Sequence, residues 1–169
     1  MKSLLIYPLL VFSILLCWSC SSSTSSSQRA VITVYDGDES WEPQSDMGFR
    51  ALGEPVFVTF CIQRVEEDQT LRTLSFTLPL KPGHCDGTFD LKTGEWSPEL
   101  KGISFTSDYT IDYNGVPGDK WIGTQASINV TEFNQEKRTI SGVVELDMWC
   151  QEKDNTKHLS IVLENVRLD

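Results

Sequence analysis

ISGVVELDMWC, residues 140–150, alternates between apolar and polar side chains. The side chains that share one face are apolar, namely Ile140, Val144, Leu146, Met148 and Cys150. The other face carries Ser141, Glu145 and Asp147. A period of two residues is typical of a β-strand that is buried on one side only. The segment therefore predicts a half-buried strand.

The same alternation recurs along the chain, in segments rich in the residue types that strands prefer. These segments are 56–62, 74–80, 103–111, 122–130 and 159–163. Turn-forming residues separate them, at 82–83, 114–119, 134–137 and 153–156. No segment of the sequence has a convincing helical stripe. We therefore expect an all-β fold, an antiparallel β-sandwich or flattened barrel of seven to eight strands.

Three irregularities interrupt this pattern. In the last segment, an unbroken alternation would put Val166 and Leu168 on the opposite face of the strand from Leu163. This change predicts a bulge near Glu164-Asn165. Gly142 lies inside a strand pattern, where it indicates a bulge or a close approach to an aromatic side chain on a neighbouring strand. Residues 36–54 are polar and contain Gly and Pro, so we expect a long loop there.

The N-terminus has the pattern of a secretory signal: one Lys, an apolar stretch over 4–16, and Cys20 directly after Ser19. The apolar stretch is too short to cross a bilayer as a helix, which needs about twenty residues. We expect residues 1–19 to be cleaved and Cys20 to be lipidated. Residues 20–28 then form a Ser-rich tether, and 29–169 form one β-sandwich domain. The sequence leaves open an ordinary signal peptide and a soluble secreted product.

The net charge and the cysteine content indicate which partners and which cellular compartment to expect. The net charge of −10 becomes −11 when Lys2 is removed with the signal, which argues against nucleic acid as a partner. An exported compartment permits disulfides. Three cysteines remain besides Cys20, so at most one internal bridge forms. We expect Cys85 with Cys150, leaving Cys61 free; three unpaired cysteines are the alternative.

Three groups of side chains are candidates for chemistry or binding. His84-Cys85-Asp86 holds adjacent potential ligands, but neighbouring residues of a strand point apart, so a disulfide at a turn is the favoured interpretation. The carboxylates of 36–54 do not match an EF-hand, and a less regular calcium site remains open. Trp121 and Trp149 break the alternation on strands that should be neighbours, which suggests one aromatic platform for a sugar or a partner protein. We expect no catalytic set, no metal site and no cofactor.

Three C-terminal segments, ASINVTEFN (126–134), TISGVV (139–144) and LENVRL (163–168), carry a resemblance. With the leader, they resemble small β-sandwich lipoproteins of Bacteroidetes-type Gram-negative bacteria, which often have I-T-E-F-D, I-S-G-T-F and F-x-N-V in these places. Asn134 stands here where Asp is usual, and Val143-Val144 replaces a small residue and an aromatic. The resemblance implies a β-sandwich and an envelope address, and the family offers no established activity to carry over.

Together these features lead us to expect a lipid-anchored envelope protein with a non-enzymatic binding or structural role. Its partner would be an envelope protein or a glycan. Ser21 after the cysteine favours the outer membrane, at its periplasmic face or at the cell surface. An accessory carbohydrate-binding module that uses exposed Trp is the second interpretation, and an envelope hydrolase has the least support.

Overall fold

The computed structural model describes residues 31–43, 50–51, 57–100, 106–111 and 115–168. The leader 1–19, Cys20 and the tether 20–28 lie outside this part of the chain. The elements in chain order are β1 (Val31–Asp36), β2 (Glu39–Trp41), β3 (Arg50–Ala51), β4 (Phe57–Val65), β5 (Leu71–Pro79), β6 (Gly83–Asp90), β7 (Glu95–Trp96), the 3₁₀ helix η1 (Pro98–Leu100), β8 (Ser107–Ile111), β9 (Pro117–Asn134), β10 (Thr139–Cys150) and β11 (Asn155–Arg167). The expectation of an all-β antiparallel fold is confirmed.

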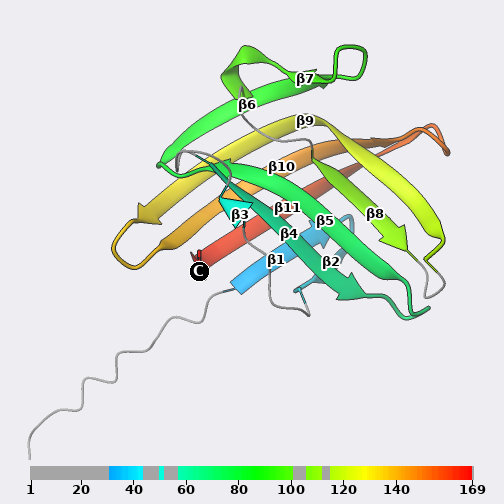
Figure 1. Ribbon diagram of the computed structural model, residues 1–169, viewed down its shortest axis with the longest axis horizontal. Helices are drawn as coiled ribbons and strands as arrows, with labels where there is room; N and C mark the ends of the chain where they lie inside the picture. The colour runs from blue at the N-terminus through cyan, green and yellow to red at the C-terminus, as the bar shows by residue number, and fades with distance from the viewer. Residues whose placement is uncertain (1–30, 44–49, 52–56, 101–105, 112–114, 169) are drawn as a thin grey trace, which may run out of the picture.

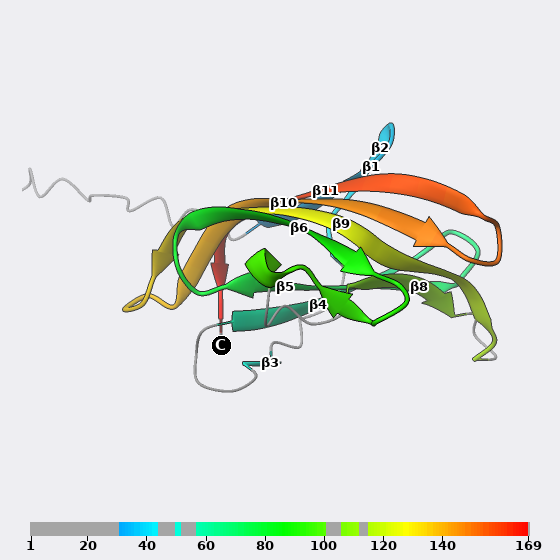
Figure 2. The same cartoon turned by 90° about the horizontal axis from the view of Figure 1, so that it is seen from above.

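One continuous sheet curls over itself, so that two parts of it lie face to face (Figures 1 and 2). The strand order is β2-β1-β11-β10-β9-β8-β5-β4-β3, and β6 also pairs with β9. We call β2-β1-β11-β10-β9-β6 the first layer and β8-β5-β4-β3 the second layer. The long strand β9 joins them, because its start pairs with β8 and its later part pairs with β6. The arrangement is the flattened-barrel form of the expected fold.

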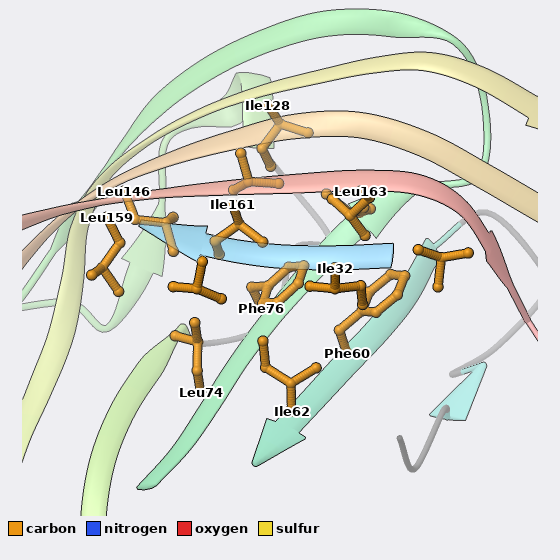
Figure 3. Packing of buried hydrophobic residues seen from close by; sticks show 14 of the residues in the cluster. Ile32, Phe60, Ile62, Leu74, Phe76, Ile128, Leu146, Leu159, Ile161 and Leu163 are labelled. Carbon is orange, nitrogen blue, oxygen red and sulfur yellow. The ribbon is translucent and has the colours of Figure 1, made fainter. Parts of the chain in front are cut away.

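The core fills the space between the two layers (Figure 3). Ile32, Ile128 and Ile161 of the first layer belong to inward rows of alternating apolar residues; the rows of Ile128 and Ile161 were predicted from the sequence, and that of Ile32 was not. The second layer contributes Phe60 and Phe76, whose rings stack with centroids 5.0 Å apart. All five side chains are almost completely buried. The hydrophobic alternation therefore sets which face of each strand points inward.

The two irregularities that were predicted inside strands are both present. Ile140 pairs with Val166 while Gly142 pairs with Leu163, so β11 holds one extra residue at Glu164-Asn165. Asn165 has a φ of 50°, in the left-handed region. The second irregularity lies between Ser141 and Gly142 in the pairing of β10 with β9. The change of parity in the sequence therefore located the bulge correctly.

The expected loop at 36–54 is wrong in its first part, because β1 and β2 form a hairpin there. Val34 pairs with Trp41 and Asp36 with Glu39. The structure has eleven strands among its described residues, where seven to eight were expected. The additional strands include β2, β3 and β7, which have only two or three residues. So few residues cannot show a period of two. Within the described residues, no helix is long and apolar enough to cross a membrane.

We expect Gly142→Ala to destabilise the fold by about 1–3 kcal/mol, the usual cost of overpacking. A Cβ atom at this position would lie 2.5 Å from the backbone oxygen of Asn129, which cannot rotate away. Chemical denaturation measures the effect. Gly118→Ala is the control, since the added Cβ there meets mainly the rotatable hydroxyl of Thr110. Equal stability of the two variants would contradict the close approach.

Candidate functional site

The inward rows of the sheet change from apolar to charged at one end. Along β4 the row Phe60, Ile62 continues to Arg64, and along β1 the row Ile32, Val34 continues to Asp36. Arg64 lies directly opposite Arg72 of β5. Arg64 and Arg72 line an open pocket of about 1000 Å³. We call it the end pocket; its lining residues are 39–42, 64–68, 70, 72, 108–110, 119, 121 and 157.

Four charged side chains join the two layers at the floor of the end pocket; Arg72, Asp108 and Lys157 line the pocket, and Asp36 is paired with Arg72 beside them. The Arg72 guanidinium donates to Asp108 from Nε, at 3.0 Å from Oδ1, and from Nη2, at 2.5 Å from Oδ2. The same Nη2 donates to Asp36 Oδ2 at 2.7 Å. Lys157 Nζ lies 2.6 Å from Asp108 Oδ2 and 3.6 Å from Asp36 Oδ2. Two cations thus neutralise two carboxylates in what we call the ion cluster.

The ion cluster is largely removed from water. The side chains of Arg72 and Asp108 are 8% and 2% exposed. Burial alone would lower the pKa of Arg72, but hydrogen bonds and attraction from Asp108 and then Asp36 outweigh it and raise that pKa above its ordinary value. Arg72 therefore stays charged, and its geometry is fixed by several charge-assisted hydrogen bonds.

Two tryptophans stand in the wall of the end pocket, and each carries a cation over its ring. The guanidinium carbons of Arg64 and Arg72 lie 5.1 and 5.2 Å from the ring centroid of Trp41. Lys157 Nζ lies 4.6 Å from the ring centroid of Trp121. These distances are within the range of cation–π attraction. The wall therefore combines aromatic rings with fixed charges.

Two further ion pairs lie toward the rim. Arg64 donates to Glu66 from Nε at 2.8 Å and from Nη2 at 2.6 Å. Lys153, in the turn between β10 and β11, lies 2.5 Å from Asp119 Oδ2 at the start of β9. Both members of this second pair are substantially exposed, so it contributes less to stability than the buried ion cluster.

The expected disulfide between Cys85 and Cys150 is wrong. The three described cysteines, including Cys61, are free thiols. Both cysteines lie on strands that pair with β9. Cys85 lies opposite Ile128 of β9, whereas Cys150 lies opposite Trp121, which is seven residues before Ile128. At about 3.3 Å per residue this is roughly 20 Å, far beyond the ~7 Å that a disulfide can span.

The expected shared platform of Trp121 and Trp149 is also wrong. Asp147 pairs with Gln125 but Met148 pairs with Gly123, so Thr124 is an extra residue in β9. This shift reverses the parity of β9, and Trp121 packs against the core on the inner face. Trp149 stays on the outer face, where its Nε1 donates to Asp154 at 3.3 Å.

The two histidines lie on the outer face, away from the end pocket. His84 Nε2 is 2.9 Å from Asp86, and both are exposed, while the intervening Cys85 packs against the core. His158 lies between Asp147 at 2.7 Å and Glu145 at 2.9 Å. The hydrogen bond to Asp147 is the main reason that the pKa of His158 is raised. Among the described residues, no group of three potential ligands is placed to hold a metal ion.

In the described part of segment 36–54, the acidic side chains do not form a single cluster. Asp36 turns inward and pairs with Arg72. Glu39 and Glu42 line the end pocket, and Asp46 lies outside the described residues. The segment therefore contributes to the pocket and to its floor.

The ion cluster was not predicted from the sequence. Asp108 fell within a predicted strand and Asp36 was grouped with the carboxylates of 36–54, while no role was predicted for Arg72 or Lys157. One signal was present, because Arg72 and Lys157 each lie two residues before an inward apolar residue, Leu74 and Leu159. A charge at an inward position predicts a buried partner.

Comparisons of the chain with protein-family models, curated protein sequences and solved structures found no match. The class that the structure defines is an all-β antiparallel fold with a charged end pocket.

We expect Asp108→Ala to lower the free energy of unfolding by about 3–5 kcal/mol, because it leaves Arg72 and Lys157 buried without their shared carboxylate. Chemical denaturation followed by circular dichroism measures the change. Asp119→Ala is the matched control, since it removes one carboxylate from an exposed ion pair, and we expect a nearly unchanged midpoint. Similar losses in both variants would contradict a special role for the buried ion cluster.

Proposed function

We propose that this protein is a lipid-anchored envelope protein that binds a small polar ligand in the end pocket without catalysing a reaction. The observation that carries the proposal is the pocket itself, with a volume of about 1000 Å³ and fixed charged and aromatic side chains in its lining. This volume is at the upper end of the range common for small-molecule sites.

Preorganisation supports a binding role. Arg64, Arg72 and Lys157 are each held by carboxylates and by a tryptophan ring, so little side-chain entropy is lost when a ligand enters. The same pairing argues against acid–base catalysis. A general acid or base works best with a pKa near the operating pH, whereas Arg72 is held in its charged form.

The N-terminal leader supports the proposed location in the cell envelope. Cys20 follows a short apolar segment and precedes a run of serines, as in the lipoproteins that the chain resembles. Several acyl chains on one residue give stable membrane anchoring, whereas a single chain binds only marginally. We place the protein at the outer membrane, at its periplasmic face or at the cell surface.

Carbohydrate binding is the second candidate function, with Trp121 alone in place of the pair Trp121 and Trp149. Trp121 lies in the wall of the polar end pocket and can still offer an aromatic contact to a sugar there. Trp149 belongs to the opposite face and cannot share that ligand.

For the anchor, we expect the full-length protein, expressed with its leader in a Gram-negative host, to partition into the detergent phase. Cys20→Ser removes the acceptor thiol, so this variant should move to the aqueous phase. Phase separation with immunodetection measures the distribution, and mass spectrometry of the N-terminus identifies the acyl groups. Equal partitioning of both proteins would rule out lipidation of Cys20.

For the pocket, we expect ligand-observed saturation-transfer NMR to detect binding from a panel of neutral sugars, amino sugars, amino acids and polyamines. Trp121→Leu keeps an apolar side chain against the core but removes the indole, so it should weaken binding severalfold. Trp149→Leu is the matched control and should bind as the unchanged protein does. Binding that depends on Trp149 instead of Trp121 would place the site on the outer face and overturn the pocket assignment.

A further inference from the structure

One edge of the first layer is open beside β6. This strand pairs with β9 through residues 83–88, while on its other side β7 pairs only with Phe89 and Asp90 (Figure 1). Residues 83–87 therefore border the sheet, and in the described part of the chain no strand covers their free side. We call this segment the open edge. Unpaired backbone N–H and C=O groups along such an edge can pair with another strand.

The backbone groups of the open edge can be assigned from Thr88. Its N–H donates to the Ser97 hydroxyl at 3.3 Å and its C=O accepts from the Ser97 N–H at 2.8 Å, so both groups point away from β9. Successive residues of an antiparallel strand direct these groups to alternate sides, and β6 pairs with β9 without a register shift. The N–H and C=O of His84 and Asp86 therefore point outward, and no backbone partner meets them among the described residues.

The side chains of the same two residues form a basic and acidic pair on the outer face. His84 Nε2 lies 2.9 Å from Asp86 Oδ2, and the two side chains are 57% and 59% exposed. A hydrogen bond from Ser127 is the main reason that the pKa of Asp86 is lowered, so this carboxylate is charged at neutral pH. Charged side chains protect an edge against pairing with most strands. A strand that presents the opposite charge at each position is the exception.

We propose that two copies of this chain associate through the open edge, strand against antiparallel strand, in a register centred on Cys85. His84 of each copy then lies opposite Asp86 of the other. Both pairs are of the hydrogen-bonded kind, in which the two residues exchange both N–H···O bonds. The basic and acidic side chains also lie directly across from each other on the outer face, which stabilises a cross-strand pair. The open edge is therefore complementary to itself, as a two-fold symmetric interface requires.

The adjacent registers that align outward backbone groups are less favourable. A register centred on Asp86 sets like charges opposite each other and directs the next outward residue at Thr88, whose backbone groups Ser97 already occupies. A register centred on His84 sets two imidazoles opposite each other and brings Asp86 against Pro82, which has no N–H. The order of residues along the open edge thus selects the proposed register.

The contact is small, because each copy contributes only residues 83–87. Interfaces well below about 1,000 Å² are weak and transient. We therefore expect a reversible dimer that a cross-link can capture. The two Cys85 residues form a non-hydrogen-bonded pair on the symmetry axis, with Cα atoms ~4.5 Å apart, a separation that a disulfide can span. The inference is independent of the end pocket and of the lipid anchor.

Oxidative cross-linking tests the contact. The full-length protein, expressed with its leader in a Gram-negative host, is oxidised with copper phenanthroline in the cell fraction that contains it. We expect a band of twice the chain mass on non-reducing electrophoresis, and a peptide linked through two Cys85 residues by mass spectrometry. Cys85→Ser should abolish this band, and Cys61→Ser should leave it. A chain that stays monomeric, links through Cys61, or links Cys85 to a different protein would overturn the proposal.

Exchange of the two charged side chains tests the register. His84→Asp sets carboxylates opposite carboxylates and should lower the cross-linked fraction about fivefold. The double variant His84→Asp with Asp86→His restores one basic and one acidic member of each pair, so cross-linking should return to within about twofold of the unchanged protein. Gln151→Glu adds a carboxylate at an exposed position in the turn after β10 and should have no effect. A double variant that cross-links no better than His84→Asp would contradict the register and the proposal with it.

A proline tests the backbone hydrogen bonds. Asp86→Pro removes an N–H that points away from β9, so the fold should survive, as it does at other edge positions. Asp86→Ala is the control, because it removes the same carboxylate and keeps the N–H. We expect the cross-linked fraction of Asp86→Pro to be about tenfold below that of Asp86→Ala, with circular dichroism checking that both variants fold. Equal cross-linking of the two folded variants would show that the backbone of the open edge is not the contact.

Discussion

The salt bridge between Arg72 and Asp108 is the constraint on which the arrangement of the two layers depends. Its neighbours Asp36 and Lys157 come from β1 and β11, while Arg72 and Asp108 come from β5 and β8. The four side chains meet only when four strands from both layers are in register. A buried ion pair adds little net stability compared with apolar packing, but breaking one is costly. The ion cluster therefore favours one register over alternatives that would leave a charge buried and unpaired.

Much of the fold could be predicted from the pattern of single strands. The alternation in residues 140–150 identified the inward row correctly, and the change of parity at Val166 located the bulge at Glu164-Asn165. A period of two residues is a local property, so sequence reveals it directly. Strands of two or three residues, such as β2 and β7, have no measurable period and were missed.

The candidate site was harder to predict, because it depends on contacts between strands that are distant in sequence. One extra residue, Thr124, reversed the face of Trp121 and separated it from Trp149. Cys85 and Cys150 lie beside the same strand, but at different heights along it. Arg72 and Asp108 are thirty-six positions apart, and no local pattern links them. Their inward parity was the one available signal.

The direction of β1 has a consequence for how the protein would face its surroundings. Val31 begins this strand and Asp36 ends it at the pocket floor, about 17 Å further along at the spacing of extended chain. With a lipid on Cys20, the eleven residues 20–30 could reach at most roughly 35–40 Å from the bilayer. The tether would then join the fold at the end of β1 that is remote from the end pocket. An attachment at that end would leave the end pocket within reach of solutes in the aqueous space.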